Sequence, residues 1–282
     1  MEVSFLTEVK RESGSLYIAE LRRGFKGERI FLKETCHTDT SNGFNGGLTE
    51  ASTLISLQES EWVPRFRILW NHWGRTYFGT DFMPGGDLMA LLERRGRFTI
   101  TETRTLGAHL TQAVESIHSL GWVHRDLKPE HLCLDSQGFL KIVSFKTCHR
   151  IGQQGDCDGL PVDYMAPEVI TRAEPYDESV DVWSIGIILY EMLFGGPPFS
   201  DEIRDRNKSI YRIINSERYL WFPSGLNEEM TVASELIQMS LKPKQSRISL
   251  DGMKAHKFFR NVNWGHLDPF ESNIDHEHLY RE

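Results

Sequence analysis

The sequence feature that most constrains the fold is a change of apolar periodicity at Met83-Pro84-Gly85-Gly86. Before it, short runs alternate apolar and polar residues between glycine-containing turns, a pattern that predicts β-strands joined by hairpins. After it, apolar residues recur at helical spacing over long stretches. We therefore predict an α+β fold of two unequal parts, a small antiparallel β-sheet unit over residues 1–83 and a larger, mainly helical unit over residues 84–260.

The expected elements follow from these two periodicities. In the small unit, strands are predicted at Phe5–Val9, Leu16–Leu21, Arg29–Lys33, Phe66–Trp70 and Thr76–Phe82, and an amphipathic helix is predicted at Leu48–Glu59. In the large unit, helices are predicted at Asp87–Arg95, Thr101–Leu120, Val180–Phe194, Lys208–Asn215 and Met230–Leu241. Residues 261–282 are polar and acidic, which predicts an extended tail.

Composition narrows the classes of function. The chain has 32 Lys+Arg against 40 Asp+Glu, a net charge of −8. This balance argues against bulk binding of nucleic-acid phosphates and leaves a local basic patch open. No apolar run reaches the roughly 20 residues that cross a bilayer, and the first residues lack the order of a signal peptide. The cysteines form no C-x-x-C pair, so we expect a reducing intracellular location, the cytoplasm, with the nucleus left open.

The strongest chemical signal is the run His124-Arg125-Asp126-Leu127-Lys128-Pro129-Glu130-His131. Met165-Ala166-Pro167-Glu168, Asp181-Val182-Trp183-Ser184-Ile185-Gly186 and Arg247 follow it in that order. In these motifs the sequence resembles the protein kinase superfamily, whose catalytic loop reads H-R-D-L-x-x-x-N and whose activation segment ends in A-P-E. The resemblance implies a bilobal protein-kinase-like fold, in which the helix of the small lobe is regulatory.

Within that superfamily the chain is similar to the AGC group of serine/threonine kinases. The similarity lies in residues 82–88, 93–98 and 256–259, the last followed by Val262-Asn263-Trp264 as at the start of an AGC tail. The run Ile210-Tyr211-Arg212-Ile213-Ile214-Asn215 favours the Rho-kinase and myotonic-dystrophy-kinase branch. The resemblance implies ATP as the cofactor and a protein as substrate or partner.

The resemblance also assigns a nucleotide site. Lys33 matches the lysine that contacts the α- and β-phosphates, and Glu50 matches its ion-pair partner. Thr80 matches the gatekeeper, the backbone from Asp81 to Met83 would meet the adenine, and Asp87 would approach the ribose.

The glycine loop departs from the family pattern. Alignment on G-x-G-x-x-G-x-V leaves Glu12, Gly14 and Tyr17 at the three glycine positions and Ala19 at the valine position. Only the middle glycine then remains. Side chains at the other two positions obstruct the close approach of backbone N–H groups to phosphate, so we expect weakened nucleotide binding.

The metal ligands depart further. The D-F-G triplet aligns with Ser144-Phe145-Lys146, and the catalytic-loop asparagine aligns with His131. Magnesium prefers hard anionic oxygen, which a serine hydroxyl and a neutral imidazole do not supply. We therefore expect no metal site at these degenerate positions. Asp126, which matches the catalytic base, and Lys128, which matches the lysine beside it, are both retained.

The activation segment carries several charged residues. Asp156 falls where AGC kinases have a phosphorylated threonine, and it is expected either to pair with Arg125 and Arg150 or to be an exposed loop acid. Glu168 is expected to pair with Arg247, by resemblance to the family. For Cys148 and Cys157, which lie on the same segment, two free thiols are favoured over a disulfide.

A peptide groove is implied by Glu130 and Glu191, which match acids that hold substrate arginines in basophilic AGC kinases, and Asp87 adds a third charge.

Two candidate functions follow from these motifs. The first is a catalytically impaired pseudokinase that acts as a scaffold or allosteric partner, binding a basic peptide or an active kinase. The alternative is an active ATP-dependent serine/threonine kinase for basic-motif substrates with atypical metal handling. The sequence leaves the oligomeric state open.

Overall fold

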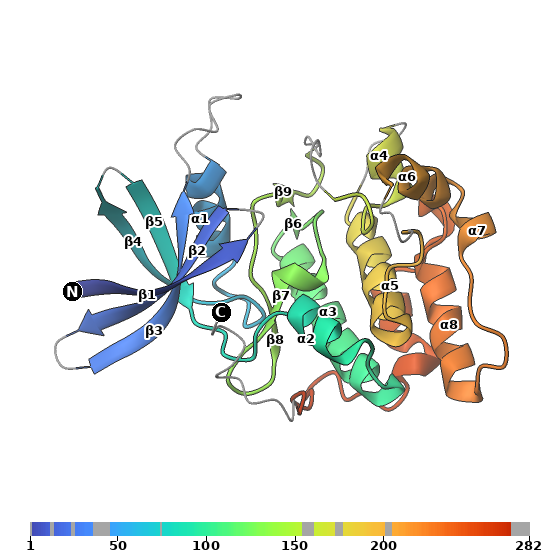
Figure 1. The fold of residues 1–282 in the computed structure, drawn as a ribbon. Coiled ribbons are helices and arrows are strands. Elements are labelled where there is room, and N and C mark those ends of the chain that lie inside the picture. The colour runs from blue at the N-terminus through green and yellow to red at the C-terminus, as the bar shows by residue number, and fades with distance from the viewer. Residues whose placement is uncertain are drawn as a thin grey trace.

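The computed structural model describes residues 2–11, 14–23, 26–35, 46–73, 75–153, 161–172, 177–200 and 205–271. These residues form two lobes, one built on a twisted sheet and the other on helices (Figure 1). The chain passes from the first lobe to the second after Asp81, where the periodicity of the sequence changes. The predicted α+β division is therefore confirmed.

The described part of the small lobe forms an antiparallel five-stranded sheet and one helix. Strands β1 (Glu2–Arg11), β2 (Gly14–Arg23) and β3 (Lys26–Thr35) make the predicted meander. Helix α1 (Gly46–Ser56) then leads to β4 (Phe66–His72) and β5 (Arg75–Asp81). The strand order is β1-β2-β3-β5-β4, so that β5 lies between β3 and β4.

The linker between the lobes is held by backbone hydrogen bonds to β7 (Leu132–Leu134). Gly85 N–H donates to the Leu134 carbonyl at 3.0 Å, and Leu134 N–H donates to the Gly86 carbonyl at 2.9 Å. A Cβ atom on Gly85 would lie 2.8 Å from the Leu134 carbonyl oxygen. Glycine is required here because the two backbones approach so closely.

The large lobe surrounds α5 (Ser179–Phe194), which is buried along almost its whole length. Helices α3 (Ile100–Ser119) and α8 (Glu228–Ser240) pack against it. Helix α3 begins with a capping box, in which Thr99 and Glu102 each accept a hydrogen bond from the backbone N–H of the other. The smaller helices are α2 (Leu88–Arg95), α4 (Pro167–Thr171), α6 (Arg206–Ile214), α7 (Ser216–Tyr219) and α9 (Leu250–Ala255).

Short strands and turns of the large lobe carry the loops that face the small lobe. Strand β7 pairs with β8 (Leu140–Ile142), and β6 (Trp122–Val123) pairs with β9 (His149–Arg150). The 3₁₀ turns are Pro129–His131, Lys244–Ser246 and Lys257–Phe259. The catalytic-loop motif therefore lies between β6 and β7.

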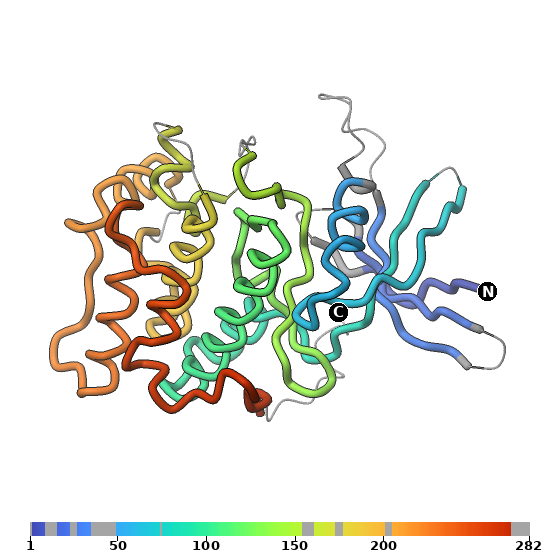
Figure 2. The backbone as a smooth tube through the Cα atoms, turned by 180° about the vertical axis from the view of Figure 1, so that it is seen from behind, coloured from blue at the N-terminus to red at the C-terminus, as the bar shows by residue number. Residues whose placement is uncertain are grey.

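The predicted tail is extended in its described part, residues 261–271. It runs back over the large lobe (Figure 2). Trp264 packs on Phe259, and Phe270 N–H donates to the Gly138 carbonyl at 3.0 Å. Residues 272–282 lie outside the described part. Among the described residues, no helix has the length and apolar character needed to span a membrane.

Candidate functional site

Lys33 on β3 and Glu50 on α1 form an ion pair across the small lobe. The Lys33 ammonium donates to both Glu50 carboxylate oxygens at 2.8 Å, and Glu50 is only 2% exposed. The same carboxylate accepts a hydrogen bond from Phe145 N–H at 3.1 Å and from the Ser144 hydroxyl at 3.5 Å. Glu50 therefore holds both the β3 lysine and the segment that replaces D-F-G.

The catalytic loop is anchored to α5 through Asp181. This carboxylate accepts the backbone N–H groups of His124 and Arg125 and the Nε2–H group of His118, each at 2.8 Å. Burial raises the pKa of Asp181, but the His118 hydrogen bond and the other donors outweigh burial and bring the pKa below its ordinary value. Arg125 has a φ of 70°, a strained conformation for a non-glycine residue.

Asp126 lies on this loop in a largely desolvated position. Burial raises its pKa to about 6, an effect that Lys128 and Arg125 oppose and Glu130 reinforces. A carboxylate with a pKa near the working pH is suited to accept a proton from a hydroxyl group. The structure thus brings together Asp126 and Lys128 as the resemblance implies.

The residues at the two metal positions do not fit magnesium. Burial lowers the pKa of His131 well below its ordinary value, so its imidazole is neutral. Its Nδ1–H donates to the Asp126 carbonyl at 2.8 Å. Ser144 is buried, and its hydroxyl is directed to Glu50. A neutral imidazole and a hydroxyl that is directed to Glu50 are a poor donor set for Mg²⁺.

Four other predicted nucleotide residues lie along β5, the linker and the start of α2. Thr80 and Met83 are buried. The Asp81 carboxylate accepts from Arg67 Nε–H at 2.5 Å and from Arg65 N–H at 3.3 Å. The Asp87 carboxylate accepts from Ala90 N–H at 2.8 Å and caps α2. The side chains of Asp81 and Asp87 thus have structural partners in the fold.

The assignment of Ala19 to the nucleotide site is wrong. Strands β2 and β3 pair without a bulge, with Ile18 opposite Phe31 and Ala19 opposite Ile30. Because side chains alternate between the two faces of a strand, Phe31 shares the face of Lys33, and Ile18 packs with it. Ala19 packs on the other face, in a separate apolar cluster.

The alignment of the glycine loop must therefore move by one residue. Ile18 then takes the valine position, and Arg11, Ser13 and Leu16 take the three glycine positions. Gly14, predicted as the surviving middle glycine, is not one of them. A slip of one residue reverses the face of every side chain in a strand, and the sequence alone carried no mark of the register.

Arg125 and Arg150 both have partners among the described residues. Arg125 donates to the Thr147 carbonyl at 2.6 Å and to His149 Nδ1 at 2.8 Å. The Arg150 guanidinium lies 4.2 Å from the centre of the Trp122 ring. Asp156, which was expected to pair with these arginines, lies outside the described residues, as does Cys157. Cys148 is a free, buried thiol, and burial raises its pKa well above the ordinary value.

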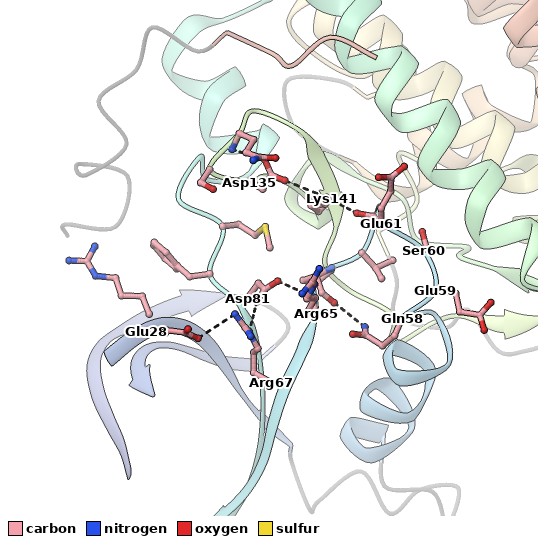
Figure 3. A pocket seen from close by; sticks show the side chains of 17 residues that line it. Glu28, Gln58, Glu59, Ser60, Glu61, Arg65, Arg67, Asp81, Asp135 and Lys141 are labelled. Atoms are coloured by element: carbon pink, nitrogen blue, oxygen red, sulfur yellow. Dashed lines mark hydrogen bonds and ion pairs between the residues drawn. The ribbon is translucent and has the colours of Figure 1, made fainter. Parts of the chain in front are cut away.

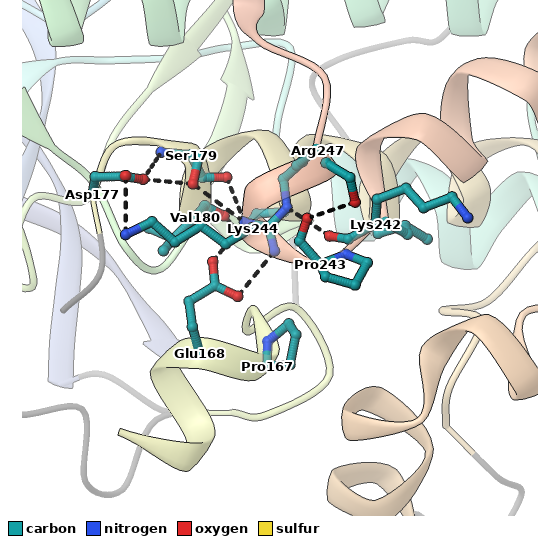
Figure 4. A network of polar contacts seen from close by, with 12 residues as sticks. Pro167, Glu168, Asp177, Ser179, Val180, Lys242, Pro243, Lys244 and Arg247 are labelled. Carbon is teal, nitrogen blue, oxygen red and sulfur yellow. Dashed lines mark hydrogen bonds and ion pairs between the residues drawn. The ribbon is translucent and has the colours of Figure 1, made fainter. Parts of the chain in front are cut away.

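Glu168 and Arg247 form a bidentate ion pair inside the large lobe (Figure 4). The two nitrogen–oxygen distances are 2.6 and 2.9 Å. The Arg247 side chain is fully buried, donates to the Ser179 carbonyl and lies over the Trp183 ring. This pair fixes the end of the activation segment to the start of α5.

Tyr164 is hydrogen-bonded to Glu191 and lies within the electrostatic influence of Glu130. The Tyr164 O–H donates to Glu191 at 2.7 Å. Burial raises the pKa of Tyr164, and both glutamates raise it further by their negative charge. The predicted acidic groove residues therefore lie close to one another, although they are far apart in the sequence.

A cavity of about 800 Å³ is lined by the end of β5, the start of the linker and segments within residues 58–67 and 135–141 (Figure 3). Arg67 crosses it and pairs with both Asp81 and Glu28. Sequence reasoning missed this cavity because its charged lining comes from positions scattered between residues 28 and 141. Lys141 pairs with Asp135 in the same lining, and Asp81 and Met83 of the predicted nucleotide site also line the cavity.

A sheet lobe carrying the Lys33–Glu50 pair and a helical lobe carrying the Asp126 loop and the Glu168–Arg247 pair define a protein kinase domain. Residues 21–259 match the protein kinase domain family, and the chain belongs to this family.

Its relatives confirm the predicted AGC resemblance. The chain is 33% identical over 230 residues to citron rho-interacting kinase of Rattus norvegicus, with 77% of the chain and 11% of the relative covered. It is 32% identical over 272 residues to serine/threonine-protein kinase MRCK gamma of Mus musculus, with 92% of the chain and 17% of the relative covered. It is 33% identical over 228 residues to Rho-associated protein kinase 1 of Oryctolagus cuniculus, with 76% of the chain and 16% of the relative covered. The chain spans less than a fifth of the length of these three relatives.

Proposed function

We propose that this kinase domain is impaired in phosphoryl transfer and acts by binding a protein, as a scaffold or an allosteric partner. The observation that carries the proposal is the chemistry at Ser144 and His131. Protein kinases hold their metal ions with an aspartate and an asparagine at these positions, and the metal neutralises the developing phosphate charge. Here the hydroxyl is directed to Glu50, and the imidazole is neutral and bonded to the catalytic loop.

The partner that best fits the domain is a basic peptide. Glu130 and Glu191 lie near the same tyrosine hydroxyl, and Glu191 is buried. Two carboxylates in a partly desolvated position favour guanidinium groups, which bind carboxylate oxygens in a bidentate manner. The proposed role is to hold an arginine-containing segment of another protein, an active kinase among the candidates, without modifying it.

The first test is a phosphotransfer assay with an arginine-rich serine peptide, ATP and magnesium. We expect the wild-type rate to be at least about a thousandfold below the roughly 1–100 s⁻¹ of typical protein kinases. The matched control is Asp126→Asn, which removes the only retained catalytic base and is expected to give the same background rate. A magnesium-dependent rate in the wild type that Asp126→Asn abolishes would contradict the proposal.

The second test measures binding of the same peptide by calorimetry at low ionic strength. Glu130→Gln is expected to raise the Kd about tenfold, because one carboxylate partner of the arginine is lost. Glu229→Gln, which changes an exposed glutamate on α8, is the control and is expected to leave the Kd unchanged. Equal Kd values for the wild type and Glu130→Gln would remove the peptide groove from the proposal.

A second candidate function is weak phosphotransfer with atypical metal handling. It is favoured by the intact Lys33–Glu50 pair and by the Asp126 pKa of about 6, which suits a general base. The same assay separates the two candidates, because only this one predicts a rate that depends on Asp126.

A further inference from the structure

One apolar cluster contains residues from both lobes and includes Phe31, which lies on the same face of β3 as Lys33. Ile18 comes from β2, Phe31 from β3, Met83 from the linker and Cys133 from β7. Their exposed fractions are 6%, 6%, 3% and 2%. Leu16, Phe82 and Val143 pack around them, and the rings of Phe31 and Phe82 lie edge to face with centroids 5.0 Å apart.

Phe31 is the unusual member of this cluster. The kinase motif around the β3 lysine reads V-A-I-K, and here it reads Ile30-Phe31-Leu32-Lys33. Phe31 therefore stands where the family pattern has alanine, two residues before Lys33 and on the same face of β3. A phenyl ring replaces a methyl group, and it reaches the linker and β7 of the other lobe.

The surroundings of Phe31 match the needs of a flat aromatic base. Met83 belongs to the linker whose backbone was expected to meet adenine, and Cys133 follows His131 on the opposite wall of the cleft. A base bound between the lobes would have to touch these same side chains. In this structure they are buried in the same apolar cluster as Phe31.

We propose that the Phe31 ring takes the place of the adenine base and joins the two lobes through Met83 and Cys133, so that the kinase domain is closed without a nucleotide. The inference deepens the proposed function and rests on it, since a scaffold must keep its shape whether or not ATP is present. The Lys33–Glu50 pair and the Glu50–Phe145 hydrogen bond coexist with this closure. The apolar contacts that the adenine base of ATP makes in a kinase are here made by the side chain of Phe31.

The test is calorimetric titration with adenosine, which has no phosphate and needs no metal. The Kd of Phe31→Ala for adenosine is expected to be at least about tenfold lower than that of the wild type, because the substitution opens the space for the base. Phe31→Ala should also lower the Tm by about 10 °C, and adenosine should restore part of that loss. The matched control is Leu32→Ala, which loses a buried side chain on the other face of β3 and should gain no adenosine binding.

A second measurement follows alkylation of the Cys133 thiol by peptide mapping. Cys133 is expected to be protected in the wild type, reactive in Phe31→Ala and protected again by adenosine. If Phe31→Ala does not fold, Phe31→Leu serves both measurements, with smaller changes in the same directions. Adenosine binding by the wild type as tight as by the variant would overturn the inference, as would a folded variant that neither binds adenosine nor exposes Cys133.

These outcomes are distinct from failure of the proposed function. A wild type that binds adenosine but transfers no phosphate refutes the role of Phe31 and leaves the scaffold proposal in place. A wild type that transfers phosphate refutes the scaffold proposal, and the adenosine titration of that same protein still decides whether the base enters the cleft.

Discussion

Replacing Arg247 by methionine is expected to lower the free energy of unfolding by about 3–5 kcal/mol. The guanidinium is fully buried and binds Glu168 at 2.6 and 2.9 Å, so its removal leaves a buried carboxylate without its cation. Urea unfolding followed by circular dichroism measures the change. The double variant Arg247→Met/Glu168→Gln is expected to recover part of the loss, because the stranded charge is gone.

The matched control is the ion pair between Lys242 and Glu217. Its nitrogen–oxygen distance is 2.9 Å, but the two side chains are 44% and 63% exposed. Lys242→Met is therefore expected to cost less than about 1 kcal/mol. A loss at Arg247 no larger than the loss at Lys242 would show that burial of the first pair does not govern its contribution.

Replacing Asp126 by asparagine is expected to stabilise the domain at neutral pH and to do so less as the pH falls. Burial raises the folded-state pKa of Asp126 from 3.8 to about 6. Below the unfolded-state pKa the carboxyl is protonated in both the folded and the unfolded state, so its burial costs no stability. As the pH rises from there through about 6 the buried carboxyl must ionise, and the folded state loses stability relative to the unfolded state. The difference of about 2 pKa units corresponds to about 3 kcal/mol, since one unit is about 1.4 kcal/mol.

Unfolding of the wild type and Asp126→Asn between about pH 4 and pH 8 measures this effect. The stability difference in favour of asparagine is expected to be near zero at the acid end and to approach about 3 kcal/mol at the alkaline end. Asp251→Asn, which changes an exposed residue in the first turn of α9, is the control and is expected to show no such slope. A constant difference between wild type and Asp126→Asn across this range would contradict the prediction.

The two predictions concern a buried ion pair that stabilises the fold and a carboxyl group on the catalytic loop. The residues that hold the fold in place are intact, as the Glu168–Arg247 pair and the contacts of Asp181 show. The residues that would hold a metal are replaced, and their replacements have partners inside the protein. A domain that keeps the residues that stabilise its fold retains a defined surface for binding, even when the residues at the metal-ligand positions are replaced. This is the basis of the proposed scaffold role.

Periodicity predicted the two lobes and the bounds of most helices and strands to within a few residues, and the resemblance to kinases implied the pairing of Lys33 with Glu50 and of Glu168 with Arg247. The sequence by itself could do so because periodicity is a local property and because the kinase motifs occur in a fixed order. The acidic groove of Glu130 and Glu191 was implied by resemblance and stays a prediction, although the Tyr164 hydroxyl donates to Glu191.

Only the tertiary structure decided the register of β2, the position of β5 between β3 and β4, and the contacts of Phe31. Alternation along a strand shows that two faces exist, but pairing with a neighbouring strand decides which face meets the cleft. Ala19 was misplaced for this reason, and Phe31 passed unnoticed as one more apolar strand residue. Its significance depends on Met83 and Cys133, which are distant in the sequence and belong to the same apolar cluster in the folded domain.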